Sequence, residues 1–135
     1  MTTITDFILA RVAEDEEAAR AAYASPWWAK DDGHVWTGDD DPDEGPTVYV
    51  NGGIYANQRR TAAHIARHDP DRVLADCRTK RRVVTRHQLR KFFHPGPNSP
   101  SLTCSWCSHV PWPCIDLRDY ASIWADHPDY DEAWR

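Results

Sequence analysis

The chain has 135 residues, of which 27% are charged and 41% are hydrophobic, and its formal net charge is −5. A chain of this length fits one domain, and no apolar run approaches the roughly 20 residues that cross a bilayer, so the composition excludes a membrane span. The N-terminal segment lacks a basic stretch before its short apolar run, which argues against a secretory signal and predicts a cytoplasmic protein.

The N-terminal part predicts one helix followed by a small β unit. Apolar residues recur at helical spacing from about Thr5 to Tyr23, and Thr5 or Asp6 is available as the N-cap. Pro26 ends this pattern. The segments HVWTG and TVYV then predict two short strands joined by an acidic, proline-containing loop. We therefore expect a short β-hairpin or small antiparallel sheet within residues 1–58.

Two further helices are predicted after this β unit. One runs through NQRRTAAHIARH and ends at His68, because the residue before a proline is disfavoured in the α region. The next begins at Pro70, with Asp69 as its N-cap, and continues to about Lys91. Its apolar positions share one face, which directs Cys77 inward.

A last helix is expected over about Ile115–Asp126, after the proline-rich loop HPGPNSPS and the cysteine cluster. Residues 59–135 thus hold basic helices, a Cys/His cluster and a C-terminal helix. The whole chain, residues 1–135, is predicted to form a single small, helix-rich α+β domain.

Three of the four cysteines lie close together, in the segment CSWCSHVPWPC. Cys104 and Cys107 form a Cys-x2-Cys pair, a spacing that lets two thiolates of one turn bind the same ion. Pro111 and Pro113 restrict the following loop and can return Cys114 to this pair. Closely spaced cytosolic cysteines bind metal more often than they form disulfides. The segment predicts a zinc-binding loop, with redox-active thiols, iron–sulfur ligation and a disulfide as alternatives.

Spacing leaves the fourth zinc ligand open among His87, His94, His109 and Cys77. His109 lies too close to Cys107 for an unstrained chelate, and a buried thiol on an apolar helix face, as at Cys77, needs no further role. His87 and His94 both remain within reach. We favour His87, because a helix end anchors the imidazole better. The predicted ligands of a structural Zn²⁺ are therefore His87, Cys104, Cys107 and Cys114.

A second histidine pair raises an enzymatic alternative. His64 and His68 lie four residues apart, as two zinc ligands on one helix face would. Ala66 and Arg67 offer no general-base carboxylate, so the hydrolase motif is incomplete. His68 is instead expected to interact with free carbonyl groups at the helix C-terminus. A metal-dependent hydrolase or nuclease using His64, His68 and His127 is the weaker hypothesis, and no catalytic residue is predicted.

Charge is segregated along the chain. Between Arg59 and Lys91 eleven basic residues stand against three acidic ones, so this segment carries +8 and the rest carries −13. A basic helix over residues 72–91 in a zinc-containing domain is typical of nucleic-acid binding. In the alternative hypothesis, the acidic stretches AEDEEAAR and DDDPDE lie against these arginines within the same molecule and neutralise them.

Seven tryptophans can bury a large area in so small a protein, and packing is their expected role. Trp27, Trp28 and Trp134 are the candidates for exposed contacts with a partner. The chain is therefore predicted to be a zinc-stabilised binding or regulatory module rather than an enzyme. The expected partner is another protein, and nucleic acid is the alternative.

Several segments also resemble an uncharacterised family from actinobacteria and their phages. These are HIARHDPDRVL, KRRVV followed by His87, the Cys-x2-Cys pair, PWPC, and YASIWADHPDYDEAWR, which span residues 64–135. Members of that family resemble this chain in the order of these residues. A histidine stands at the end of the helix that contains KRR, and the Cys-x2-Cys pair and then a Pro-Cys dipeptide follow it. The resemblance implies that His87 and the three clustered cysteines form one site, and that the protein is a cytosolic protein of actinobacterial or phage origin.

Overall fold

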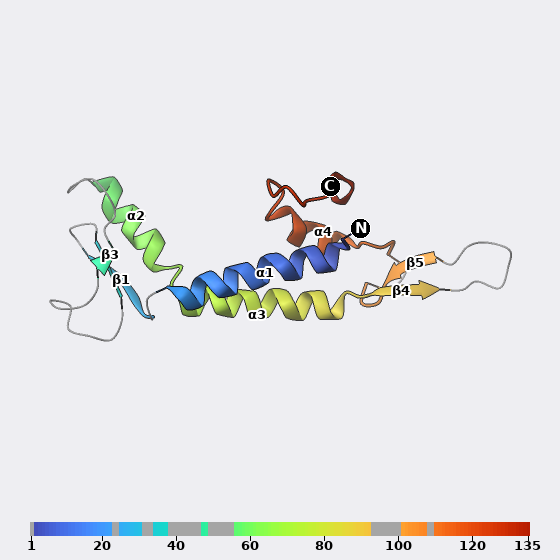
Figure 1. Ribbon diagram of the computed structural model, residues 1–135, viewed down its shortest axis with the longest axis horizontal. Coiled ribbons are helices and arrows are strands. Elements are labelled where there is room, and N and C mark those ends of the chain that lie inside the picture. The colour runs from blue at the N-terminus through green and yellow to red at the C-terminus, as the bar shows by residue number, and fades with distance from the viewer. Residues whose placement is uncertain are drawn as a thin grey trace. The chain divides into compact units, whose positions relative to one another are not determined.

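The computed structural model describes residues 2–22, 25–30, 34–37, 47–48, 56–92, 101–107 and 110–135. Helices predominate over short antiparallel strands (Figure 1), which confirms the predicted helix-rich α+β class. The chain divides into unit 1, residues 1–14 and 78–135, and unit 2, residues 15–77. None of the described helices is both long enough and apolar enough to cross a membrane. The single domain over residues 1–135 stays a prediction.

Unit 2 contains a three-stranded antiparallel sheet. Its strands β1 (Trp27–Ala29), β2 (Val35–Thr37) and β3 (Thr47–Val48) pair in that order, and α2 (Ala56–Ala66) packs against β1 and β2. Val35 and Thr37 are buried on one face of β2, as the strand period of two requires. The predicted pair of strands, β2 and β3, is confirmed. Strand β1 was not predicted, because it is defined by its pairing with β2.

Two helix N-termini follow local capping rules. Helix α1 (Ile4–Ala21) begins one residue earlier than expected, because Ile4 is buried and Thr3 caps the helix by accepting the Asp6 N–H at 3.1 Å. Neither Thr5 nor Asp6 is therefore the N-cap. Helix α3 (Pro70–Arg86) begins as predicted, with the Arg72 N–H donating to the Asp69 carboxylate at 3.0 Å.

The C-terminus of α3 differs from the prediction. The helix ends at Arg86 and not near Lys91, and the next residues form β4 (Leu89–Phe92), which pairs antiparallel with β5 (Ser101–Cys104). The apolar pattern alone extends the helix too far, because it carries no sign of the pairing between β4 and β5, which are separated by a proline-rich stretch of sequence. This hairpin carries the first cysteine of the cluster at the end of β5.

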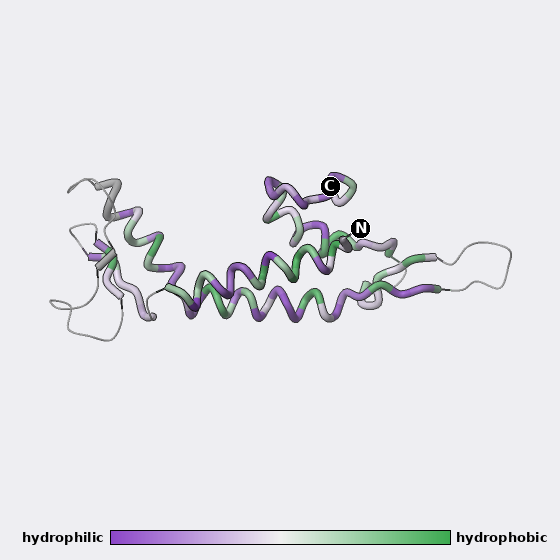
Figure 2. Tube along the Cα trace, viewed as in Figure 1, coloured by the Kyte–Doolittle hydropathy of each residue, from purple (hydrophilic) through white to green (hydrophobic). Residues whose placement is uncertain are grey.

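The core of unit 1 joins the two ends of the chain. Helix α4 (Ile115–Ser122) is shorter than predicted and is followed by turns and a 3-10 helix, η1 (Glu132–Trp134). Hydrophobic residues gather at the N-terminal end of α1 (Figure 2), where the Phe7 ring lies 5.1 Å from that of Trp134. Trp134 is only 8% exposed. Its predicted role as an exposed contact is wrong, because it fills this core.

Replacing Phe7 by alanine is expected to lower the free energy of unfolding by about 3–5 kcal/mol, because the side chain is 2% exposed and the cavity cannot collapse fully. Urea denaturation followed by circular dichroism measures this loss. The matched control is Phe92→Ala, which removes the same side chain from a 40% exposed position and is expected to cost about 1 kcal/mol or less. Equal losses for the two variants would contradict the proposed core.

Candidate metal site

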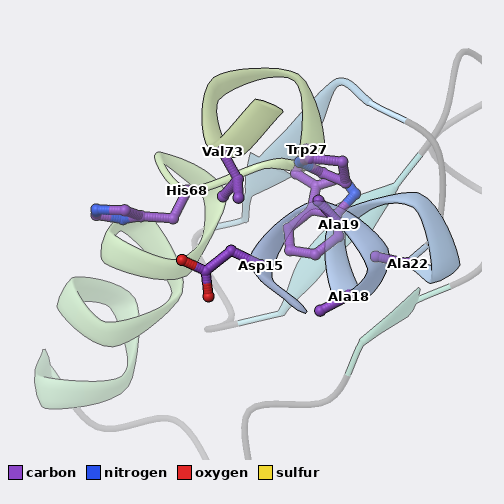
Figure 3. Close-up of a pocket in the computed structure, with 8 residues that line it drawn as sticks. Asp15, Ala18, Ala19, Ala22, Trp27, His68 and Val73 are labelled. Carbon is purple, nitrogen blue, oxygen red and sulfur yellow. The ribbon is translucent and has the colours of Figure 1, made fainter. Parts of the chain in front are cut away.

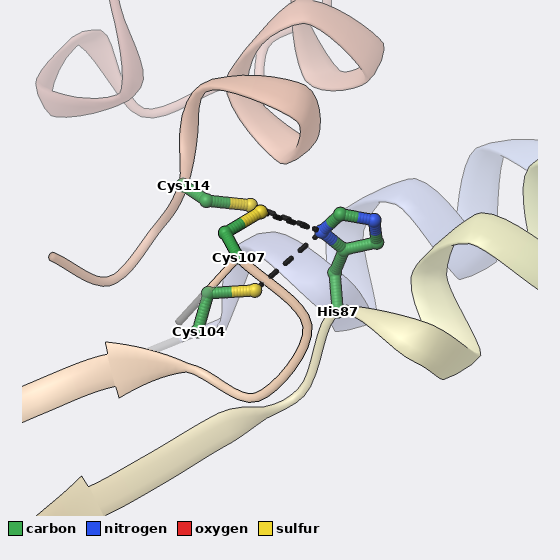
Figure 4. A group of neighbouring side chains, drawn as sticks. All are labelled: His87, Cys104, Cys107 and Cys114. Carbon is green, nitrogen blue, oxygen red and sulfur yellow. Dashed lines mark hydrogen bonds between the residues drawn. The ribbon is translucent and has the colours of Figure 1, made fainter. Parts of the chain in front are cut away.

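His87 follows directly after α3. Its backbone N–H donates to the Val83 carbonyl at 3.1 Å, which continues the last helical turn, and the residue is 5% exposed. The side chain is therefore held by the end of a regular helix, which directs Nδ1 toward the cysteine cluster (Figure 4).

The Cys-x2-Cys turn is fastened to the C-terminus of α3 by Ser105. The Ser105 hydroxyl donates to the Arg86 carbonyl at 2.8 Å and accepts the Gln88 N–H at 2.9 Å, while the Ser105 N–H donates to the Gln88 carbonyl at 2.8 Å. These bonds satisfy backbone groups that the helix end leaves unpaired. They place Cys104 and Cys107 beside His87.

Cys114 reaches the same place because the chain turns back along β5. The Trp112 N–H donates to the Leu102 carbonyl at 3.1 Å, and the Cys104 N–H donates to the Val110 carbonyl at 3.0 Å. Cys114 then stands at the N-cap of α4, with extended backbone angles. The predicted return of Cys114 to the cysteine pair is what the structure shows.

The four side chains converge on one point. His87 Nδ1 lies 3.5 Å from Cys104 Sγ, 3.4 Å from Cys107 Sγ and 3.3 Å from Cys114 Sγ, and all four donor atoms lie within 4.8 Å of one another. One imidazole nitrogen offers a single N–H or a single lone pair, so it cannot hydrogen-bond three sulfur atoms. Metal–sulfur and metal–nitrogen bonds of about 2.3 and 2.0 Å in a tetrahedron place N and S about 3.5 Å apart. These four residues could bind a metal ion.

Burial and the contacts between the thiols affect the protonation of all three cysteines. Burial, with hydrogen bonds from the neighbouring thiols, raises the pKa of Cys107 to about 12, and burial also raises the pKa of Cys114. Burial acts in the same direction on Cys104, but hydrogen bonds to the backbone of Cys107 and Trp106 leave its pKa lowered. A bound cation would favour the deprotonated form of these thiols, which is the form that binds metal. All four cysteines of the chain are free thiols.

Two polar residues of this site were not predicted. Ser105 is not a metal ligand, so the cysteine spacing gives no signal for it. Its role is to bond the end of α3, which the sequence alone does not place beside it. Asp116 lies in the first turn of α4, with Oδ2 3.6 Å from both His87 Nδ1 and Cys107 Sγ. The sequence offers only a weak signal for Asp116, namely a carboxylate two residues after a cysteine at a helix start.

The other histidine candidates do not join this cluster. His94 and His109 lie outside the described residues. His68 Nδ1 lies 2.9 Å from the His64 carbonyl oxygen, which agrees with the expected contact at the helix C-terminus. His127 contacts Arg11 and the Asp129 N–H. Within the described part of the chain, no group of three or more potential metal ligands includes His64, His68 or His127.

A separate pocket of about 220 Å³ lies in unit 2. Its walls are mostly apolar, and they include Trp27 and Val73 (Figure 3). Among the described residues that line it, Asp15 and His68 are the titratable ones, and the His68 ring points away from Trp27. These described residues bring no recognisable nucleophile and base together.

Comparison with known proteins identifies the family. The chain matches a family described as "Family of unknown function (DUF6221)" over residues 1–135. The chain belongs to this family. Membership in DUF6221 confirms the expected uncharacterised family, whereas the actinobacterial or phage origin stays a prediction. No curated protein and no solved structure matches this DUF6221 chain.

Removal of a predicted ligand should abolish tight metal binding. We expect His87→Ala to weaken Zn²⁺ affinity by more than about 100-fold, which exceeds the usual effect of losing an outer-shell partner. Competition with a chromogenic chelator measures the affinity. The control is His94→Ala, which should retain wild-type affinity. A reversed result, with His94→Ala impaired and His87→Ala normal, would show that the fourth ligand has been misassigned.

Metal binding should release protons. Near pH 7 the raised pKa values keep Cys107 and Cys114 protonated without metal, so binding as thiolates displaces at least two protons per ion. The apparent affinity should therefore fall as the pH falls. A pH indicator in weakly buffered solution counts the protons during Zn²⁺ titration. Metal binding without proton release would mean that the thiols are not the ligands.

Proposed function

We propose that this DUF6221 protein is a zinc-stabilised binding module of the reducing cytosol, and not an enzyme. The observation that carries the proposal is the convergence of three sulfur atoms on one imidazole nitrogen, with His87–sulfur distances of 3.3 to 3.5 Å. The proposal includes a reducing compartment, because disulfide formation would remove the thiolate ligands, and all four cysteines are free.

Zinc is the ion that best suits these donors. Three cysteines and one histidine are a common ligand set of tetrahedral structural zinc sites. An iron–sulfur cluster holds several atoms between its ligands, whereas all four donor atoms here lie within 4.8 Å and leave room for one ion. Hard cations such as Mg²⁺ prefer oxygen ligands.

The position of the cluster supports a structural role for the ion. Its ligands come from the end of α3, the β5 turn and the start of α4. Four protein ligands complete a tetrahedron and leave no open position for a reacting water. Structural zinc sites contribute about 10–16 kcal/mol of apparent binding free energy, while whole domains are stable by about 5–15 kcal/mol. The ion would therefore decide whether unit 1 folds.

The proposed role is binding, because the described residues offer no catalytic set around this ion. For a protein partner, Trp28 is the best of the three indoles considered, since it is 46% exposed while Trp134 is buried. A single exposed indole is weak support for such a surface. The exposed arginines on α3 of unit 1 favour a nucleic acid as the partner.

Zinc removal tests the proposal. Unit 1 should lose its cooperative thermal unfolding transition when a chelator removes the ion, and an equimolar addition of Zn²⁺ should restore it. Calorimetry and near-ultraviolet circular dichroism follow the transition, with native mass spectrometry counting one ion per chain. Re-addition of Mg²⁺ is the control and should restore nothing. A metal-free chain that unfolds at the same temperature as the untreated protein would disprove a structural zinc.

A further inference from the structure

The outer side of α3 carries a stripe of arginines. Arg78, Arg82 and Arg86 are spaced by four residues, so they project from one side of the helix at intervals of about 6 Å. All three are exposed. Among the described residues none of the three guanidinium groups forms an ion pair. The opposite side points inward, where Lys80 is 9% exposed and its ammonium group lies 5.0 Å from the Trp124 ring.

An exposed indole lies at the end of this stripe. Trp106 is 64% exposed, and it stands between Cys104 and Cys107 in the ligand-bearing turn. Its ring lies 5.8 Å from the Arg86 guanidinium carbon and 6.5 Å from the His87 ring. The turn that would bind the ion therefore also fixes the position of Trp106. Together we call Arg78, Arg82, Arg86 and Trp106 the arginine–tryptophan surface.

Strand β4 adds further positive charge next to this surface. Arg90 and Lys91 are exposed, and much of β4 has the hydrophilic colour in Figure 2. The Arg90 guanidinium carbon lies 5.8 Å from the Phe92 ring. Basic and aromatic groups thus continue from α3 past the ligand-bearing turn into the hairpin.

We propose that the arginine–tryptophan surface binds single-stranded nucleic acid; this inference rests on the proposed zinc-stabilised binding module. Guanidinium groups in a row neutralise successive phosphates, and an exposed indole stacks on an unpaired base. A duplex keeps its bases stacked on one another, so Trp106 would gain nothing from it. An acidic protein would satisfy the arginines but would leave the indole without a flat partner.

The overall charge of −5 does not oppose this binding. Unit 1 contains ten basic and eight acidic residues and carries +2, whereas unit 2 contains six basic and thirteen acidic residues and carries −7. The arginine–tryptophan surface belongs to unit 1, whose own net charge is positive. A bound nucleic-acid strand would contact the arginines of this surface directly, and salt screens exposed charges more strongly the farther away they lie.

The test uses the full, zinc-loaded chain and a fluorescein-labelled oligothymidylate of about 16 nucleotides, followed by fluorescence anisotropy. Between about 50 and 200 mM salt, the slope of log affinity against log salt should be about −2 for three phosphate contacts. Arg82→Gln should reduce the size of this slope by about 0.7. The matched control Arg67→Gln, which removes an exposed arginine of unit 2, should leave the slope unchanged.

The indole is tested separately. Trp106→Ala should weaken binding by about 5- to 150-fold, the effect of one lost stacking contact, and Trp106→Phe should recover most of it. Trp28→Ala, which removes an exposed indole of unit 2, is the control and should bind normally. Zinc content and thermal unfolding are measured for every variant, so a folding defect is recognised.

Four outcomes would overturn the inference. They are no binding by a zinc-loaded and cooperatively folded chain, equal affinity for a duplex of the same length, equal competition by polyglutamate, and normal binding by Trp106→Ala. Equal competition by polyglutamate would indicate an acidic protein partner instead. All four leave the zinc module itself intact, whereas a chain that folds fully without metal refutes the proposed function.

Discussion

The convergence of three thiols on one imidazole nitrogen is the constraint on which unit 1 depends. Its four donors come from three successive segments, the end of α3, the β5 turn and the start of α4, and they meet only if α3 ends at Arg86 and the β4–β5 hairpin folds back. The contact between the Phe7 and Trp134 rings stabilises a different part of unit 1, where α1 packs against η1. A bound ion would therefore join the end of α3, the β5 turn and the start of α4 at one point.

The same turn connects stability to the proposed binding surface. Ser105 ties the turn to the C-terminus of α3, Cys104 and Cys107 supply sulfur ligands, and Trp106 between them is left in solvent. An exposed indole normally samples several rotamers, and ordering it on binding has an entropic cost. Its contacts with Arg86 and His87 reduce that freedom beforehand. Loss of the ion would thus disturb the surface as well as the fold.

Local patterns account for what could be predicted from the sequence. The start of α3 at Pro70 and the inward direction of Cys77 follow from capping and helical periodicity, and Cys-x2-Cys is itself a local signal. Strands β1, β4 and β5 were missed, because each is stabilised by a partner strand and not by its own residues. Ser105 and Asp116 were missed for a related reason, since their partners are brought near only by the folded chain.

The distribution of ion pairs explains why the arginine stripe stays available in a protein with an acidic excess. The buried Arg11 pairs with Glu14 at 2.6 Å and lies 3.9 Å from Asp129, and Arg135 pairs with Glu132 at 2.9 Å. The acidic C-terminal segment is thus engaged by basic residues outside α3. Among the described residues, AEDEEAAR forms no ion pair with Arg78, Arg82 or Arg86. The second acidic stretch of that prediction, DDDPDE, lies outside the described residues. Their charge is therefore left for a ligand that brings its own negative groups.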